Sequence, residues 1–174
     1  FLALEDDRLY SKRYWQYEQN FCYFIATKLS SSSLMQWESD LSHKHSEISR
    51  MMKLMFSSLI VKNKVPDFQQ LSVLNALHSP FSIITGGAGT GKTYTITRLA
   101  VLLSHIRNIP ANLIEMAAPT GKAANRLAQS LGDELLTLSA IPELKSICTQ
   151  LRSIVPKTIS RLLKVNPTNG QSAY

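Results

Sequence analysis

A run of eight residues, GGAGTGKT at positions 86–93, constrains the fold of this chain more than any other feature. It matches the pattern G-x-x-x-x-G-K-[ST], with an apolar segment at residues 81–85 before it and a helix-forming segment after it. A strand, a glycine-rich turn and a helix in this order are typical of a phosphate-binding loop. A turn used only for packing would not need Lys92 and Thr93 at these positions, so we favour a triphosphate site.

The residues of this loop have expected roles. We expect the loop to bind ATP through its backbone and through Lys92, which would reach the β and γ phosphates. Thr93 would complete the Mg²⁺ shell, so Lys92 and Thr93 are the candidate catalytic residues and Thr93 is the candidate metal ligand. The predicted cofactor-binding residues of the loop are Gly86, Gly87, Ala88, Gly89, Thr90, Gly91, Lys92 and Thr93. The dinucleotide pattern G-x-G-x-x-G is excluded, because it would need glycine where Lys92 or Tyr94 stands.

Gln70 is a further candidate for cofactor binding. In many helicases a glutamine shortly before the loop contacts adenine, because its amide offers both a donor and an acceptor to the base edge. Gln70 also stands three residues after Asp67, which follows Pro66 and can cap a helix. A capping box explains Gln70 equally well from the local sequence.

The carboxyl-terminal part has the pattern of an α/β protein. The strand predicted at residues 81–85 and the helix from Lys92 are followed by a second predicted buried strand at 113–118 and a helix from Gly121. This alternation predicts the start of a parallel sheet. We therefore expect a partial RecA-like sheet of the P-loop NTPase class over residues 63–174.

The amino-terminal part is predicted to be a small, mostly helical module over residues 1–62. Two short strands should flank the acidic turn Glu5-Asp6-Asp7, and an aromatic-rich helix should follow, with one further helix in residues 36–50. We expect the aromatic side chains to lie in a core rather than to stack on bases; they are Tyr14, Tyr17, Phe21 and Phe24. The linker is expected at 62–66.

Charge is unevenly distributed along the chain. The whole sequence has a net charge of +7; residues 86–174 carry ten Lys or Arg against four Asp or Glu, whereas residues 1–85 carry nine against eight. A basic half favours a polyanionic partner, and nucleic acid before a membrane. No stretch is long and apolar enough for a membrane span, and the two cysteines match no zinc spacing. We expect a cytoplasmic protein without membrane contact.

A second motif, AAPTGKAANRL at residues 117–127, follows the predicted second strand. A helix start here would direct its free N–H groups, the Thr120 hydroxyl and Lys122 toward one edge of the sheet, which suits a phosphate. A helix cap with a solvated Lys122 is the alternative. The motif resembles one found in superfamily 1 helicases of the RecD branch, the alpha subunit of exonuclease V. The runs at 85–93 and 157–163 occur in the order of that family.

The resemblance implies an ATP-dependent 5′ to 3′ DNA helicase subunit that acts on broken ends in recombinational repair, together with two larger subunits. It also implies that Thr120 and Lys122 contact the backbone of single-stranded DNA. The chain ends before a Walker B strand would be expected, so we expect these residues alone to be inactive. Two departures are Ala88, where the family usually has Pro, and Ser160, where it usually has His, so the resemblance assigns no role to Ser160.

Two other functions are compatible with the sequence. A P-loop ATPase or kinase outside DNA metabolism would account for the glycine-rich turn, although not for the second motif or the basic half. A partner-docking fragment without catalysis would account for the aromatic, nearly neutral amino-terminal region. Binding to single-stranded DNA that weakens with added salt would count against the first of these.

Overall fold

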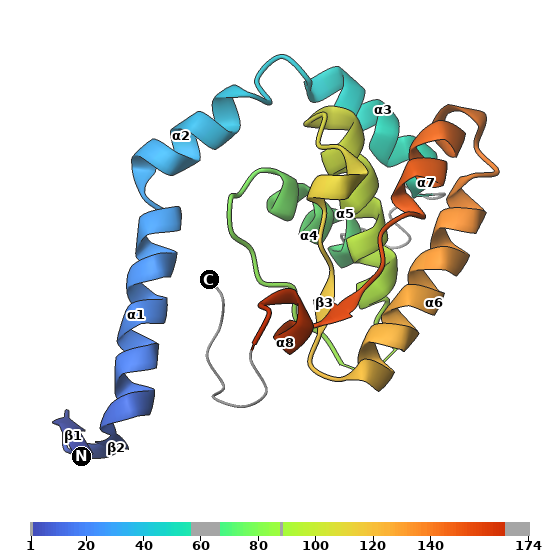
Figure 1. Ribbon diagram of the computed structural model, residues 1–174. Helices are drawn as coiled ribbons and strands as arrows, with labels where there is room; N and C mark the ends of the chain where they lie inside the picture. The colour runs from blue at the N-terminus through green and yellow to red at the C-terminus, as the bar shows by residue number, and fades with distance from the viewer. Residues whose placement is uncertain (1, 57–66, 88, 166–174) are drawn as a thin grey trace.

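The computed structural model describes residues 2–56, 67–87 and 89–165, apart from the side chains of Ser31 and Ser33. An amino-terminal hairpin and two helices form an arm, and the remaining helices pack together beside it (Figure 1). In chain order the elements are β1 (Leu2–Glu5), β2 (Arg8–Ser11), α1 (Lys12–Lys28), α2 (Ser31–Ser39), α3 (His45–Met55), α4 (Phe68–Leu77), α5 (Lys92–Ile106), η2 (Ala111–Leu113), β3 (Ala117–Ala118), α6 (Gly121–Leu138), η3 (Pro142–Leu144), α7 (Lys145–Leu151), β4 (Lys157–Thr158) and α8 (Ile159–Leu162).

The predicted hairpin at the amino terminus is confirmed. β1 and β2 pair antiparallel, with Glu5 opposite Arg8 across a turn at Asp6 and Asp7. Both turn residues have positive φ, 47° and 60°. Two consecutive residues with positive φ are typical of a two-residue hairpin loop. Asp tolerates a positive φ better than most residues do.

The prediction that the α1 aromatics lie in a core is wrong. No residue of α1 is buried, and Tyr14, Phe21 and Tyr23 are 67%, 53% and 77% exposed. The helix stands away from the packed helices (Figure 1), so its aromatic stripe has few described neighbours to pack against. One of these neighbours is Phe81, whose ring meets that of Phe24 edge to face with centroids 6.3 Å apart.

The helix predicted within residues 36–50 is two helices, α2 and α3, separated at residues 40–44. α3 begins at His45 and includes the apolar residues that follow position 50. Its Met51, Met52 and Met55 are at most 4% exposed and share one core with Val73 of α4 and Val101 of α5. α3 therefore packs as part of the carboxyl-terminal core, although it precedes the predicted domain boundary. That boundary and the predicted linker at 62–66 lie outside the described residues.

Arg107 attaches the arm to this core. Its Nη2 donates to the carbonyls of Trp37 and Leu77, each at 3.0 Å, and its guanidinium lies 3.6 Å from the centre of the Trp37 ring. Trp37 in turn donates from Nε1 to the Leu77 carbonyl at 2.9 Å. The planar guanidinium of Arg107 thus binds two carbonyls and one ring at the same time. These contacts join the end of α2 to the end of α4.

The predicted parallel sheet is only partly present in the described residues. β3 and β4 pair in parallel, with Ala117 opposite Lys157 and Ala118 opposite Thr158, and α6, η3 and α7 form the crossover. The strand predicted at 113–118 is thus limited to its last two residues. Residues 81–85 are not in a strand, and Ile83 is 70% exposed. A buried parallel strand needs neighbouring strands to pair its backbone groups, and the described residues supply none beside it. None of the described helices is long and apolar enough to cross a membrane.

Glu47 on α3 is expected to make stability depend on acidity. Its hydrogen bonds with Arg50, and after these its hydrogen bond with His105 at 2.6 Å, lower the pKa of Glu47 to about 2. Because this folded-state pKa lies below the ordinary value of 4.5, ionised Glu47 stabilises the fold above that pH, and the contribution is lost as pH falls from 4.5 to about 2. The effect is small, since the Glu47 side chain is 36% exposed.

We expect Glu47→Gln to make the fold less sensitive to acid. Urea unfolding of the two proteins at about pH 6 and about pH 3 should show a smaller drop in midpoint for the variant. An equal drop in both proteins would contradict a role for the Glu47 carboxylate in acid sensitivity.

Candidate functional site

The phosphate-binding loop has the backbone conformation that its glycines predict. Gly89 and Gly91 adopt φ of 76° and 82°, a region that L-residues with a Cβ rarely occupy. A Cβ at Gly86 would lie 2.6 Å from the Thr90 hydroxyl, which donates to the Gly87 carbonyl at 3.0 Å. Ala88, the departure from the family pattern, lies outside the described residues.

Lys92 begins α5 directly after the loop. Its ammonium donates to the Gly86 carbonyl at 2.9 Å and to the Gly87 carbonyl at 2.5 Å, so the charge lies over the turn. The first N–H groups of α5 and the positive end of its helix dipole both point toward the loop. A concave turn, a lysine ammonium and a helix amino terminus together fit a triphosphate.

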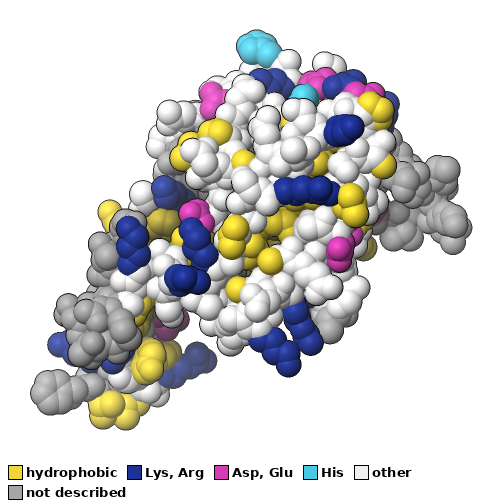
Figure 2. All heavy atoms as spheres, turned by 45° about the vertical axis from the view of Figure 1, so that its right-hand side comes forward, with side chains coloured by type: hydrophobic (Ala, Val, Ile, Leu, Met, Phe, Trp, Pro, Cys, Tyr) yellow, Lys and Arg dark blue, Asp and Glu magenta, His cyan; other side chains and the backbone are white. Residues whose placement is uncertain are grey.

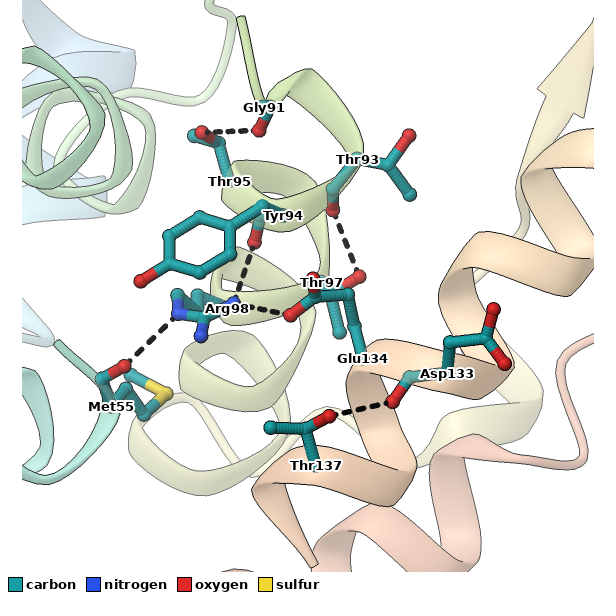
Figure 3. Close-up of polar contacts among 10 residues, drawn as sticks. All are labelled: Met55, Gly91, Thr93, Tyr94, Thr95, Thr97, Arg98, Asp133, Glu134 and Thr137. Atoms are coloured by element: carbon teal, nitrogen blue, oxygen red, sulfur yellow. Dashed lines mark hydrogen bonds and ion pairs between the residues drawn. The ribbon is translucent and has the colours of Figure 1, made fainter. Parts of the chain in front are cut away.

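The loop opens onto a cavity of about 410 Å³ between α5 and α6. Lys92 and Thr93 line one side of it, and Ser130, Asp133 and Glu134 of α6 line the other. Thr93 and the two carboxylates appear together in Figure 3. The predicted Mg²⁺ ligand Thr93 therefore shares a cavity with two acidic side chains whose presence there the sequence did not indicate.

Gln70 contacts the capping residue of α4, although by a bond between side chains rather than by the reciprocal backbone bond of a capping box. Asp67 caps α4 by accepting from the N–H groups of Gln69 and Gln70, and the Gln70 amide donates to Asp67 Oδ2 at 3.1 Å. Gln70 is 8% exposed. Its neighbour Gln69 instead reaches the phosphate-binding loop, where its amide donates to the Thr90 carbonyl at 3.0 Å. Gln69 was missed because the sequence offers two adjacent glutamines and only the helix start distinguishes them.

The second motif begins α6 as predicted. Thr120 is the N-cap residue, and its hydroxyl accepts from the N–H of Ala123 at 3.2 Å. Thr120 and Lys122 are both exposed at this end of the helix, immediately beyond β3. These observations fit the alternative of a helix cap with a solvated Lys122. The position of both residues at a helix amino terminus also fits a phosphate-binding site.

A similar helix start lies beside it. Thr158 ends β4 and caps α8 by accepting from the N–H of Arg161 at 3.2 Å. Because β3 and β4 are parallel neighbours, the two capped helices start at the same edge of the pair. A cavity of about 590 Å³ lies beside α8, and it is lined by Glu115, Lys157, Arg161, Leu162, Leu163 and Lys164. Ser160 is exposed at this site.

Basic side chains predominate over acidic ones on the face drawn in Figure 2. The charge of Lys157 is partly neutralised, because its ammonium donates to both carboxylate oxygens of Glu115 at 2.9 and 3.0 Å. The parallel pairing thus brings Thr158 and the start of α8, which carries Arg161, to the same edge as Thr120, although they lie far from it in sequence.

Arg98 is the functional candidate that the sequence reasoning missed. It is 4% exposed, and it donates to Met55 of α3, to Tyr94 of α5 and to Glu134 of α6 (Figure 3). The signal was present: Arg98 lies three and four positions before Val101 and Leu102, on the apolar side of the helix. A charge at such a position needs partners.

Known proteins resemble the chain over most of its length. Residues 69–173 match the family described as "AAA domain". The chain is 34% identical to the "RecBCD enzyme subunit RecD" of Haemophilus influenzae over 176 residues, which cover 99% of the chain and 26% of the relative. It is 31% identical over 170 residues to the protein of the same name from Mycobacterium tuberculosis strain H37Rv, covering 95% and 26%. In Buchnera aphidicola subsp. Schizaphis graminum the identity is 36% over 87 residues, covering 49% and 14%.

The chain spans about a quarter of the length of the first two relatives. The matched domain model covers more than half of the chain and includes the phosphate-binding loop and both helix starts at the β3–β4 edge. This domain is a P-loop nucleoside triphosphatase of mixed helix and sheet. The chain therefore belongs to the AAA domain family and, with these relatives, to its RecD branch.

Proposed function

We propose that this chain provides the ATP phosphate-binding loop and a single-stranded DNA contact of the first motor lobe in an ATP-dependent 5′ to 3′ DNA helicase subunit. The observation that carries the proposal is the packing of α5, which begins at the loop, against α6, which begins at the second phosphate-binding motif (Figure 1). Two anion-binding helix starts on adjoining helices suit one nucleotide and one nucleic acid backbone. The sheet around them would be RecA-like.

The residues of the loop would hold the nucleotide. Lys92 would exchange its two carbonyl partners for phosphate oxygens, to which an ammonium donates more strongly. Thr93 would hold Mg²⁺ by its hydroxyl, and Gln69 would hold the loop through the Thr90 carbonyl. Mg²⁺ would supply the positive charge that neutralises the phosphate oxygens during hydrolysis. Adenine contact by Gln70 would require its amide to leave Asp67.

The arm is the proposed partner-binding part. α1 exposes aromatic side chains over its whole length, and the curated relatives are named as subunits of the RecBCD enzyme. Docking to two larger subunits would bury this surface. We propose that the complex acts in the cytoplasm on the ends of broken DNA. Because α3 packs in the carboxyl-terminal core, the docking module would comprise the hairpin, α1 and α2 rather than all of residues 1–62.

The DNA part of the proposal is tested by Lys122→Ala. The variant should bind labelled oligothymidylate several-fold more weakly than the parent in fluorescence anisotropy. The slope of log affinity against log salt should also be smaller by about 0.7, the share of one phosphate contact on a single strand. Lys145→Ala is the matched control, because Lys145 is an exposed lysine at the start of α7, beyond the carboxyl end of α6.

Equal binding by the Lys122→Ala and Lys145→Ala proteins would contradict the assignment of Lys122. Complete absence of salt-sensitive binding in the parent would instead favour a P-loop ATPase outside DNA metabolism or a docking fragment.

A further inference from the structure

Arg98 is held by contacts with three helices. Its Nε donates to the Met55 carbonyl at 3.1 Å, and its Nη1 donates both to the Tyr94 carbonyl at 3.2 Å and to Glu134 Oε2 at 2.9 Å. The guanidinium lies over the Tyr94 ring, with Cζ 3.1 Å from the ring centre, and 5.3 Å from the centre of the Phe56 ring. A planar cation with several fixed donors holds such an arrangement in one geometry.

The two partners of Nη1 lie on different helices, α5 and α6, at the same cavity. Tyr94 is two residues after Lys92, in the first turn of α5, so its carbonyl moves with the end of the phosphate-binding loop. Glu134 lies on α6 and lines the same cavity as Lys92 and Thr93 (Figure 3). The Glu134 side chain is 29% exposed, whereas that of Arg98 is 5% exposed. One buried nitrogen thus connects the nucleotide loop to a carboxylate on α6.

α6 connects this carboxylate to the proposed DNA contact. The helix runs without interruption from Gly121 to Leu138, with Thr120 as its cap. At about 1.5 Å per residue, Glu134 lies roughly 20 Å along the axis from that cap. Leu131 and Leu135, on either side of Glu134, are buried in the core, so the carboxyl-terminal half of α6 is firmly packed. An uninterrupted helix would move as one rigid element, so a shift at Glu134 would reach its amino terminus.

We infer that Arg98 and Glu134 are positioning residues that couple nucleotide binding at the Lys92 loop to DNA binding at Thr120 and Lys122. Phosphate entering the cavity changes the charge that Glu134 faces, and binding at the loop shifts the first turn of α5. Both changes act on the hydrogen bonds of the same guanidinium, which holds α5 and α6 together. The inference rests on the proposed function, since it requires both ligands.

The test measures coupling rather than affinity alone. Binding of labelled oligothymidylate to the chain is titrated by anisotropy with and without the non-hydrolysable analogue AMP-PNP and Mg²⁺. In the parent we expect the analogue to change the DNA dissociation constant at least about fivefold, the lower range of measured couplings. In Glu134→Gln, which keeps the side-chain shape and an acceptor for Arg98, the change should fall below about twofold, while each ligand still binds alone.

Glu47→Gln is the matched control. Glu47, like Glu134, is a carboxylate that joins α5 to another helix. Its partner on α5 is His105, which lies near the end of the helix that is far from the loop. It should keep the coupling of the parent. Arg98→Lys, which retains the charge without the fork of donors, should lose coupling as Glu134→Gln does; if it does not fold, Glu134→Gln decides the test.

Full coupling in Glu134→Gln would overturn the inference, as would an equal loss in Glu47→Gln, which would indicate general loosening of α5. A parent that binds both ligands without coupling would overturn the inference and leave the proposed function standing. A parent that binds neither ligand would overturn both.

Discussion

Replacing Arg98 with methionine is expected to lower the free energy of unfolding by about 3 kcal/mol. Methionine fills a similar volume, so the loss comes from polar groups rather than from a cavity. The Met55 carbonyl loses the Arg98 donor, the Tyr94 carbonyl keeps only its helical bond, and Glu134 loses its cation, where Arg98 is 4% exposed. A buried polar group without a partner costs about 1–3 kcal/mol, and the contact with the Tyr94 ring is lost as well.

Urea unfolding followed by circular dichroism measures this loss. Arg126→Met is the matched control: Arg126 is exposed on α6, and its replacement should change the free energy of unfolding by less than about 0.5 kcal/mol. Adding Glu134→Met to Arg98→Met should recover part of the loss, because an unpaired carboxylate is then removed. A loss below about 1 kcal/mol for Arg98→Met would contradict a structural role for its hydrogen bonds.

The helix starts of the site could be predicted from sequence because they depend on local chemistry. Asp67 caps α4, Thr120 caps α6, and positive φ occurs at Gly89 and Gly91, all within a few residues of the atoms that they contact. The hairpin at Asp6 and Asp7 is local in the same way. These features need no distant part of the chain to be in place.

The strands could not be predicted in the same way, because they depend on distant partners. Residues 81–85 and 113–116 have the composition of buried strands, but a strand requires a neighbouring strand for its backbone groups. In the described residues the second segment pairs with β4 at Ala117 and Ala118 alone. The α1 aromatics have helical spacing without the surrounding elements that would bury them. Periodicity indicates which face is apolar, and the packing of other elements decides whether that face is covered.

The candidate site combines features set by the local sequence with features that depend on distant residues. The loop and the cap of α6 are local, whereas the cavity between Thr93 and Asp133 and the hydrogen bond between Arg98 and Glu134 join residues 36 or more positions apart. The two glutamines after Asp67 show the limit of local reasoning, since the sequence does not distinguish Gln69, which donates to the Thr90 carbonyl, from Gln70, which donates to Asp67. The helix begins so that one side chain turns inward and the other toward Thr90.

Lys92→Ala is expected to weaken nucleotide binding about 10- to 100-fold, because a hydrogen bond to a charged group contributes about 1.5–3 kcal/mol. The exposed Lys92 ammonium makes its described hydrogen bonds only to the Gly86 and Gly87 carbonyls, so the variant should fold almost as stably as the parent. Lys122→Ala is the matched control, since it removes a lysine from the start of α6 rather than from the loop.

Titration of the parent, Lys92→Ala and Lys122→Ala proteins with a fluorescent ATP analogue in the presence of Mg²⁺ is the most direct measurement of whether the glycine-rich turn binds triphosphate. We predict saturable binding by the parent and by Lys122→Ala, with competition by ATP and ADP, and a dissociation constant at least about tenfold higher for Lys92→Ala. Equal affinity of the Lys92→Ala and parent proteins, or no saturable binding by the parent, would contradict this function for the loop.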